Sequence, residues 1–383
     1  MMTWKIALLF VVAWLAYIWI GYPCLLWLLR RMKGRTIQRY QGELTPMISI
    51  LLPVHNEQER LGAKVDDCLS LDYPPEKLEI LIISDNSTDH TEAIAEQLAG
   101  QDPRIRLLRT SSRAGKSGAQ NLGVEHAKGE LLFMTDANTR IPPSTLKLLL
   151  ENFADPKVGM VTATAYFGEP GNAVAKGQSA YWRYELFLRR MESEIGILAT
   201  GSGQLLLMRR ELFRPIPVIY GDDCILPMDV RLQGHRVIQD TRAVVFDTMP
   251  HSIDGELRAR IRMTARNWTG TLSRPALLNP FRFPVTTWGL ISHKLMRWLT
   301  PFLLCALFLI STLMVFEKQL VSFWILQVAF YIGALVGWLR TRRGQRAWVF
   351  AYPFAFCLAN AGFFLGMVKV LRSQRITSYS SGS

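Results

Sequence analysis

The 383-residue sequence has few cysteines, and their arrangement points away from two common roles of this residue. The five cysteines show none of the paired Cys/His spacings that are typical of zinc sites. Three of them, Cys24, Cys305 and Cys357, lie in or beside long apolar runs. That placement favours buried free thiols in a reducing compartment over disulfides. The sequence also has no internal repeat, and no low-complexity segment beyond the terminal SYSSGS.

Charge is absent from four long stretches of the chain. The first covers 24 residues from Ile6 to Leu29, which is enough for a helix to cross the ~30 Å hydrocarbon core of a bilayer. The others are Trp298–Phe316, Leu320–Leu339 and Trp348–Val368. They predict an integral membrane protein. The first run exceeds the usual ~7–15-residue apolar region of a signal peptide and lacks a small-residue cleavage pattern, so we expect a retained anchor.

Basic residues next to these runs indicate how the chain is oriented. A basic group directly follows the first run, and the positive-inside tendency places everything downstream on the cytoplasmic side. Basic residues also occupy the last loop and the tail. With four full spans the basic tail would lie outside, against this tendency, and the basic loop competes for the inside. One C-terminal segment is therefore expected to be interfacial or re-entrant. The segment Trp288–Trp298, WGLISHKLMRW, has the composition of a helix lying in the membrane surface. The basic residues are Arg30, Arg31, Lys33 and Arg35, then Arg340, Arg342, Arg343 and Arg346, then Lys369, Arg372 and Arg375.

The charged residues are unbalanced, with 44 Lys and Arg against 31 Asp and Glu, which gives a net charge of +13. Such an excess fits anionic lipid headgroups and phosphate-bearing ligands. A nucleic-acid partner is not expected, because no basic stripe accompanies a known reader motif.

Between about Thr45 and Phe283 the pattern changes to strands that alternate with helices. Three β-rich runs, MISILLPVHNE, LEILIISDNSTDHT and GELLFMTDAN, are nearly continuous in apolar residues until they end in polar ones. Helix-like stretches follow the first two, at Gln58–Leu69 and Thr91–Leu98. This alternation predicts an α/β domain, Rossmann-like, with a mainly parallel sheet.

Each of these three strands ends in a short polar cluster. The clusters are His55, Asn56 and Glu57, then Asp85, Asn86 and Ser87, then Asp136 and Asn138. Any one of them could be ordinary turn chemistry, because Asp and Asn are common turn formers. Three at equivalent places favour a binding site, since ligands of open α/β sheets bind beyond the carboxyl ends of the strands.

Six motifs in order, PVHNE, SDNSTD, GKSGAQN, DAN, GSGQ and GDD, resemble those of membrane-bound inverting glycosyltransferases of family 2, which have the GT-A fold. The similarity covers roughly Met47 to Trp268. The resemblance implies a nucleotide-diphosphate sugar as donor, with a UDP-sugar as first expectation. It also implies a lipid or glycan acceptor at the membrane, and transfer of the sugar with inversion.

The resemblance assigns several residues to the donor. The expected nucleotide-sugar residues are Pro53, Asn56, Glu57, Asp85, Lys116 and Asp136. Asp136 and Asn138 stand in the family's DxD motif, where carboxylates hold a divalent cation against the diphosphate. Mg²⁺ and Mn²⁺ both suit oxygen ligands. Asn138 departs from DxD and adds no negative charge, which predicts weaker metal binding; a plain turn residue is the alternative.

The resemblance also assigns the acceptor side. In YGDDC, Asp223 is the expected base that takes the acceptor's proton, and Asp222 orients it. Two buried neighbouring carboxylates are expected to raise each other's pKa. The segment Ala199–Arg210 resembles the acceptor-side loop, although an ordinary turn would also explain its glycines. Arg262, Arg266 and Trp268 are expected at the diphosphate and acceptor, or else on a helix face against acidic lipid. No Gln completes the QxxRW motif of processive relatives, so processivity stays open.

The expected organisation is an anchor at 1–30, a GT-A domain at 45–283, an interfacial segment at 284–297, about three spans at 298–371 and a tail at 372–383. Two other functions stay open. One is a processive synthase that extrudes its polysaccharide through the spans. The other is a nucleotide-sensing membrane protein without catalysis, which Asp223 disfavours, because a sensor has no need of a base.

Overall fold

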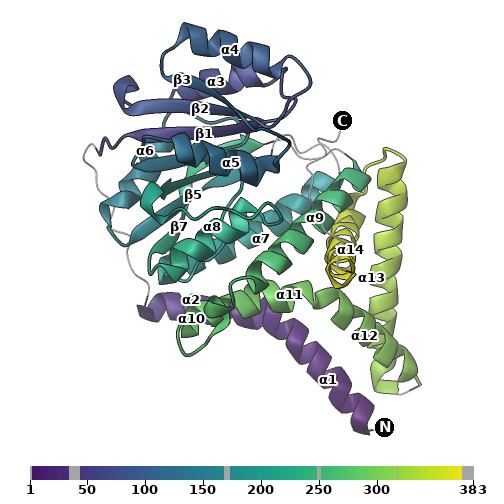
Figure 1. The fold of residues 1–383 in the computed structure, drawn as a ribbon. Helices are drawn as coiled ribbons and strands as arrows, with labels where there is room; N and C mark the ends of the chain where they lie inside the picture. The colour runs from purple at the N-terminus through teal and green to yellow at the C-terminus, as the bar shows by residue number, and fades with distance from the viewer. Residues whose placement is uncertain (1, 34–43, 168–172, 248–251, 317, 373–383) are drawn as a thin grey trace.

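A computed structural model describes residues 2–33, 44–167, 173–247, 252–316 and 318–372. Arg35, Arg375 and nearly all of the expected tail lie outside these ranges. The described chain forms an α/β part and a group of long helices on one side of it (Figure 1).

The α/β part is built on one sheet of seven strands. Their order across the sheet is β3-β2-β1-β4-β6-β5-β7. Neighbouring strands are parallel except on both sides of β6, which runs antiparallel to β4 and to β5. The expected α/β fold with a mainly parallel sheet is therefore confirmed. The strands are β1 (Ile48–Val54), β2 (Leu78–Ser84), β3 (Ile105–Arg109), β4 (Leu131–Thr135), β5 (Val158–Phe167), β6 (Leu205–Arg209) and β7 (Arg236–Asp247).

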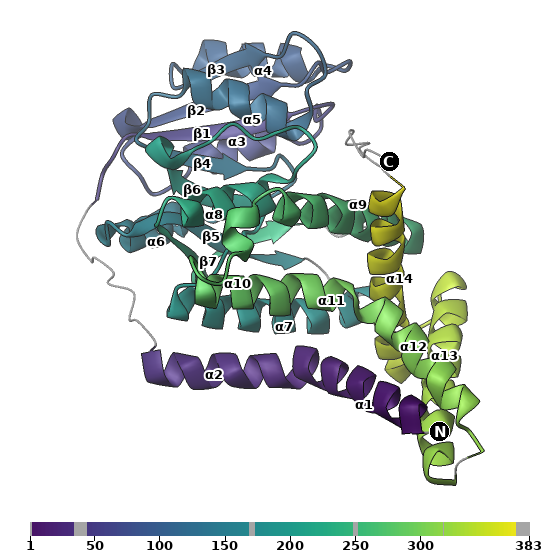
Figure 2. The same ribbon diagram turned by 60° about the horizontal axis from the view of Figure 1, so that its bottom comes forward.

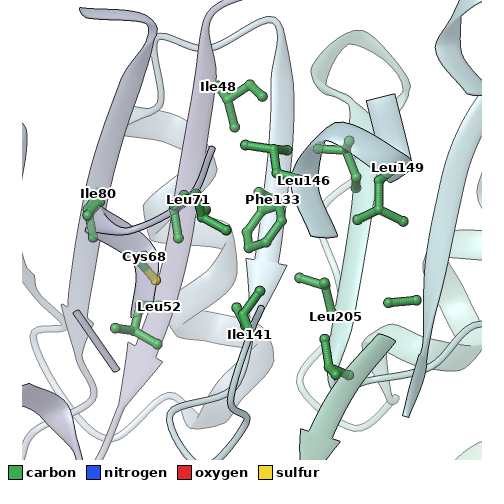
Figure 3. Close-up of a cluster of buried hydrophobic side chains, with 14 of the residues drawn as sticks. Ile48, Leu52, Cys68, Leu71, Ile80, Phe133, Ile141, Leu146, Leu149 and Leu205 are labelled. Atoms are coloured by element: carbon green, nitrogen blue, oxygen red, sulfur yellow. The ribbon is translucent and has the colours of Figure 1, made fainter. Parts of the chain in front are cut away.

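The apolar runs become strands because both faces of the sheet are covered. Every residue of β2 and of β4 is buried. Side chains on one face pack with α3, α4 and α6, and Figure 3 shows part of this cluster around Phe133. Side chains on the other face pack with α5 and α8. These helices are α3 (Leu61–Leu69), α4 (Thr91–Gln101), α5 (Gly115–His126), α6 (Thr145–Leu150) and α8 (Asp222–Leu232). Alternate strand residues thus serve two cores, which is why the strands read as continuous apolar runs.

Three described helices are long and apolar enough to cross a membrane, at Met2–Met32, Leu320–Arg342 and Trp348–Leu371. The first joins α1 (Met2–Ala16) and α2 (Tyr22–Lys33) through a π-helical turn at Tyr17–Gly21. The other two contain α13 (Lys318–Arg342) and α14 (Ala351–Leu371). A fourth span results if Pro284–Trp298 and Thr300–Leu313, which meet at a 55° bend, are counted as one.

The segment before this bend differs from the sequence-based expectation. It consists of α10 (Pro284–Leu290), a π-helical turn η6 (Ile291–Leu295) and α11 (Met296–Trp298), followed by α12 (Thr300–Leu313). Its basic residues His293, Lys294 and Arg297, which suggested a helix facing lipid headgroups, are all buried. They form ion pairs with glutamates of α7 (Ala173–Ile195), because a carboxylate inside the protein compensates their charge. That this segment lies at the membrane surface stays a prediction.

Helix α7 lies between the sheet and the membrane-type helices. Figure 2 shows α10 and α11 running along α7, with α2 on the side away from the sheet. Contacts of α7 with β7, α2 and α14 support this arrangement. The helix α9 (Ile253–Leu272) also packs on α14. The α/β part therefore meets the apolar helices chiefly through α7, α9 and the α10–α11 segment.

Candidate active site

The polar clusters that follow β1, β2 and β4 meet at one edge of the sheet. The three strands are parallel neighbours, so their carboxyl ends point the same way. The first two clusters are bonded to each other. His55 Nδ1 lies 2.9 Å from the carbonyl oxygen of Asp85, and the backbone N–H of Thr88 donates to Asn56 Oδ1 over 2.8 Å.

Asn56 and Asn86 also have a conformational reason to be asparagine. Each has φ of 56°, in the left-handed region that asparagine tolerates better than most residues. The neighbouring Glu57 pairs with Arg60 at 3.3 Å and donates its backbone N–H to Thr91 Oγ1. Asn56 and Glu57 thus shape the turns beyond β1 and β2, while Pro53 lies within β1 opposite Ile83.

Asp85 fixes the start of α5. Its two carboxylate oxygens accept the backbone N–H groups of Ala114 and Gly115 over 2.6 and 2.8 Å. The first N–H groups of a helix have no partner within the helix, and a carboxylate there satisfies them and complements the helix dipole. This anchor holds Lys116, the next residue of the chain, in a defined position.

Lys116 joins four of the motifs. Its ammonium lies 2.6 Å from Asp136 Oδ1 in DAN and 3.0 Å from Asp222 Oδ2 in GDD. It also donates to the carbonyl oxygen of Gly203 in GSGQ over 3.1 Å. The lysine expected near the donor and the two carboxylates expected at the metal and the base are therefore neighbours in space.

The surroundings of Asp136 disfavour the ionised form of its carboxyl group. Burial is the main cause that raises the pKa of Asp136, to about 6, and the charges of Asp222 and Asp247 raise it further. Lys116 opposes the rise through its charge and its hydrogen bond. Excess negative charge thus gathers around Asp136, a condition that an added cation would relieve.

Asp247, the last residue of β7, was not predicted from the sequence to belong to the site. Its Oδ1 accepts from Asn138 Nδ2 over 2.8 Å, and its Oδ2 accepts from Gln204 Nε2 over 3.2 Å. The signal was present, because VVFD is another apolar strand that ends in a carboxylate. The antiparallel β6 brings the end of β7 to this edge, and one sequence does not reveal that pairing.

Lys64 of α3 was not predicted from the sequence either, and it supports the DAN loop from the face of the sheet that α3 covers. It is 1% exposed, and its ammonium donates to Thr135 Oγ1 over 2.9 Å and to the carbonyl oxygen of Thr139 over 2.6 Å. Burial lowers the pKa of Lys64, although Asp136 and other nearby groups oppose this. A lysine inside an amphipathic helix gives no sequence signal for such a role.

Asp222 and Asp223 begin α8, where the helix dipole favours negative charge. Their pKa values shift in opposite directions, which corrects the expectation that both would rise. Burial alone would raise the pKa of Asp222, but Lys116 and a 2.8 Å hydrogen bond from Gln120 lower it below its usual value. Burial and the charge of Asp222 raise the pKa of Asp223. A neighbouring pair of this kind holds one firmly ionised carboxylate and one nearer to neutrality.

Glycines make room around Asp223. A Cβ on Gly221 would lie 2.5 Å from Asp223 Oδ1, and one on Gly203 would lie 3.6 Å from the Cβ of Asp223. The backbone N–H of Gly201 donates to the carbonyl oxygen of Asp223 over 2.7 Å. The glycines of GSGQ and GDD thus let two backbone segments approach closely beside the carboxylate.

Helix α9, which packs on the apolar helix α14, contributes residues next to this site. Arg266 donates through Nη2 to the carbonyl oxygen of Tyr220, just before GDD. The ring of Trp268 packs edge-on against that of Trp298, with centroids 5.8 Å apart. Arg262 is partly buried and Arg258 is exposed. Arg266 therefore binds the backbone of the segment that leads into GDD.

The donor set at Asp136 suits a hard divalent cation. Asp136, the amide oxygen of Asn138 and the nearby Asp247 are oxygen donors, which Mg²⁺ and Mn²⁺ prefer. Among the described residues, no three or more His, Cys, Asp and Glu side chains converge as a ready metal cage. The fit therefore rests on the chemistry of the donors and on the excess of carboxylate charge around Asp136.

Comparison with known proteins identifies the domain that carries these motifs. Residues 49–216 match the family model described as "Glycosyl transferase family 2". These residues form a family 2 glycosyltransferase domain. The match includes all but the first residue of β1, the whole of β2 to β6 and five of the six motifs, and GDD at 221–223 lies just beyond its end.

Two curated relatives resemble this family 2 domain. The chain is 31% identical over 163 residues to a beta-monoglucosyldiacylglycerol synthase of Synechocystis sp., covering 42% of this chain and 33% of that one. It is 26% identical over 223 residues to a poly-beta-1,6-N-acetyl-D-glucosamine synthase of Staphylococcus aureus, covering 56% and 53%. The chain thus spans between a third and about half of the length of these relatives.

A solved structure resembles nearly the whole chain. It is the mannosyltransferase PcManGT of Pyrobaculum calidifontis, in complex with GDP-Man and Mn²⁺. The likeness has a TM-score of 0.76 at 20% identity and covers 96% of this chain and 99% of that one. It confirms the GT-A fold that the motifs implied.

Replacing Lys116 tests the electrostatics of the site. Lys116→Met removes the ion partner of the partly buried Asp136 and of the buried Asp222, which should lower the free energy of unfolding by up to about 3–5 kcal/mol at pH 8. The loss should shrink toward pH 5. Without the lysine the pKa of Asp136 rises above its present value of about 6, so protonation removes the uncompensated charge there. Urea unfolding in detergent at both pH values measures this.

The exposed Lys128→Met provides the matched control, and its stability should match that of the wild type at both pH values. A Lys116→Met loss that is equal at pH 5 and pH 8 would show that packing, rather than charge pairing, accounts for the effect.

Proposed function

We propose that this protein is a membrane-anchored glycosyltransferase that takes a sugar from a nucleotide-diphosphate sugar and transfers it, with inversion, to a lipid or growing glycan at the membrane. The proposal keeps the division into an anchor, a catalytic domain at 45–283, a membrane-proximal segment and a C-terminal group of spans. The catalytic domain faces the cytoplasm.

One observation carries the proposal. Lys116 binds both Asp136 and Asp222, while Asp223 beside them has a raised pKa. A site with one ionised carboxylate and one carboxylate shifted toward neutrality has the groups needed for general-base catalysis. A nucleotide sensor needs a pocket for the nucleotide but has no use for this second carboxylate.

The donor is held at the carboxyl edge of the sheet. The turns after β1 and β2, with Asn56, Glu57 and Asp85, border the nucleotide, and Lys116 faces the diphosphate. Asp136 and Asn138, with Asp247 beside them, would hold the divalent cation. Bound there, Mg²⁺ or Mn²⁺ would neutralise charge on the departing nucleoside diphosphate. The mannosyltransferase structure that contains GDP-Man and Mn²⁺ has this fold, which supports the choice of a metal-type donor site.

Transfer then requires a group that accepts the acceptor's proton. The acceptor oxygen forms a bond to the anomeric carbon as the bond from that carbon to the diphosphate oxygen breaks on the opposite face. Asp223 takes the hydroxyl proton in the same step. Asp222, kept ionised by Lys116, stabilises the positive charge of that lysine beside the diphosphate. Arg266 holds the backbone before GDD, and Arg262 lies on the membrane side, where the acceptor would enter.

The acceptor is proposed to be membrane-associated. The chain's relatives include a synthase named for a glucosylated diacylglycerol and one named for a polysaccharide. A single transfer to a lipid is favoured, because the glutamine of the processive QxxRW motif is absent. Trp268 packs on Trp298 rather than standing free. A processive synthase remains the alternative.

A donor screen tests the proposal. Purified protein in nanodiscs, with and without membrane lipid extract, is given UDP-, GDP- and dTDP-sugars, and free nucleoside diphosphate is measured. We expect one nucleotide family to be turned over, and lipid extract to increase the rate. Tight donor binding without diphosphate release under any condition would favour the nucleotide sensor, and a ladder of polymer products would favour the processive synthase.

The metal prediction follows from Asp136. Excess chelator should abolish turnover, and Mn²⁺ or Mg²⁺ should restore it, because the diphosphate leaves as an anion that must be neutralised. Asn138→Asp should keep activity and reach half-maximal rate at a lower metal concentration, since it adds a carboxylate beside Asp247. Full activity in chelator would contradict the metal assignment. An inactive but folded Asn138→Asp would show that the amide bond to Asp247 matters more than the charge.

The orientation prediction follows from Arg30 and Arg31, at the end of the first candidate span. The catalytic domain should resist added protease in intact cells and be cleaved in inverted membrane vesicles, because basic flanks stay on the cytoplasmic side. Immunoblotting against the domain measures this. Cleavage in intact cells would reverse the topology and would rule out a cytoplasmic donor.

The base prediction separates an enzyme from a sensor. Asp223→Asn keeps the size of the side chain but removes the proton acceptor, so kcat should fall by ~10²–10⁴-fold. Donor affinity should stay within about twofold of wild type, since the donor is held by other residues. Single-turnover assays and calorimetry measure the two quantities.

The exposed Asp66→Asn serves as the matched control and should behave as wild type. Normal turnover in Asp223→Asn would assign the base to another group, with Asp222 the first to test. Loss of donor binding would assign the GDD segment to the nucleotide pocket.

A further inference from the structure

A buried ion cluster lies beside the candidate base, and two of its members, Arg189 and Lys294, line one small cavity with Asp223. Its centre is Glu185 of α7, which is 3% exposed. Four cationic or ionisable side chains surround this one carboxylate. They are Arg189 Nε at 3.0 Å, Lys294 Nζ at 2.9 Å, His293 Nε2 at 3.1 Å and Arg297, which donates through Nη2.

The cluster binds α7 to the segments around it. His293 also places its Nδ1 2.6 Å from Glu192, and Glu192 accepts from the hydroxyl of Tyr22 in α2 over 2.5 Å. Burial alone would raise the pKa of Glu185, but Arg297, Lys294 and His293 outweigh it and hold that pKa well below its usual range. Glu185 is therefore a fixed anion, which holds the cations around it in place.

Arg189 differs from the other partners of Glu185, because it extends from the cluster to the candidate site. It is 7% exposed, and while its Nε holds Glu185, its Nη1 donates to the carbonyl oxygen of Gly201 over 2.8 Å. The N–H of the same Gly201 donates to the carbonyl oxygen of Asp223 over 2.7 Å. One peptide segment thus connects the guanidinium to the backbone of the candidate base.

The surroundings of Gly201 leave little room for this segment to shift. A Cβ on Gly201 would lie 3.3 Å from Pro227 Cγ and 3.5 Å from the carbonyl oxygen of Asp223. Arg189, Gly201, Asp223 and Lys294 line one small cavity, so the guanidinium and the carboxylate of Asp223 face a common space.

We propose that Arg189 is a positioning residue for Asp223: anchored by Glu185, it holds Gly201, and through Gly201 it fixes the backbone that carries the candidate base. This inference rests on the proposed role of Asp223. It adds a connection from that carboxylate, through α7, to the segment 284–298. None of the residues that make this connection from α7 belongs to the six motifs.

Besides positioning the backbone of Asp223, Arg189 also affects the pKa of Asp223 through its charge. Asp223 faces Asp222 on its own helix, Lys116 from α5, Arg266 from α9 and Arg189 from α7, and Lys294 lines the same cavity. Removing the charge of Arg189 removes one of the cations that oppose the upward pKa shift of Asp223. The acidic limb of the kcat–pH profile should then move to higher pH, because the base stays protonated over a wider range.

The test compares two variants of Arg189 with one control. Arg189→Met removes the hydrogen bonds and the charge, and should lower kcat by about 10- to 100-fold, the scale of a small misplacement of a catalytic group. The donor KM should change less than twofold, and the acidic limb should move to higher pH. Arg189→Lys keeps the charge but cannot hold both Glu185 and Gly201, so it should leave the acidic limb near wild type while kcat still falls.

The control is Arg190→Met. Arg190 is the next residue of α7, exposed and paired with Glu194 at 2.9 Å, so its kcat and pH profile should match wild type. Thermal unfolding in detergent checks that each variant is folded. If Arg189→Met does not fold, Arg189→Lys decides, because its ammonium still compensates Glu185.

Three results would overturn the inference. Wild-type kcat in a folded Arg189→Met or Arg189→Lys would show that Gly201 needs no such support. A parallel rise in KM with unchanged kcat would assign Arg189 to donor binding. Normal turnover of Asp223→Asn would remove the base itself, and the inference with it, whereas an inactive Asp223→Asn beside a fully active Arg189→Met would reject the inference alone.

Discussion

The arrangement of the site depends on the ammonium of Lys116, because it is shared between the partly buried carboxylate of Asp136 and the buried carboxylate of Asp222. Asp136 and Asp222 come from segments more than 80 residues apart, and each would lose hydration on burial without an ion partner. Lys116 bonds both at 2.6 and 3.0 Å and binds the carbonyl oxygen of Gly203 as well. The opposite pKa shifts of Asp222 and Asp223 follow, since Asp222 has the lysine as a partner and Asp223 has Asp222 as a neighbour.

Contacts on the two faces of the sheet hold Lys116 and the loop of its partner Asp136 in place. Asp85, at the end of β2, receives the first N–H groups of α5, so Lys116 projects from a fixed helix end. On the opposite face, the buried Lys64 bonds Thr135 and Thr139, on both sides of Asp136. One lysine therefore supports the DAN loop, and the other faces the groups that the donor would meet. An apolar residue in place of Lys64 would leave the buried carbonyl oxygen of Thr139 without this hydrogen bond, and one in place of Lys116 would leave Asp136 without its ion partner.

Buried ion pairs also fix the side of the molecule where α7 meets the 284–298 segment. Glu185 collects four cationic or ionisable partners between α7 and the segment 284–298, and Arg189 extends that cluster to Gly201 and Asp223. Buried charges of this kind contribute less to net stability than to the choice of one geometry, because any shift would separate an ion pair in a low-dielectric interior. The proposed transfer from a soluble donor to a membrane-associated acceptor would depend on such a fixed geometry between the α/β part and the apolar helices.

The sequence by itself determined the local features of this protein. Continuous apolar runs ending in polar residues gave β1, β2 and β4, and the ordered motifs gave the family 2 domain and its GT-A fold, because these signals lie within short windows of the chain. The tertiary structure alone decided which distant groups meet. The antiparallel β6 brings Asp247 to Asn138, Lys116 separates the pKa values of Asp222 and Asp223, and α7 turns the basic residues 293, 294 and 297 inward. Those outcomes depend on strand pairing and on the desolvation of charges by neighbours far along the chain, and neither leaves a periodic pattern in one sequence.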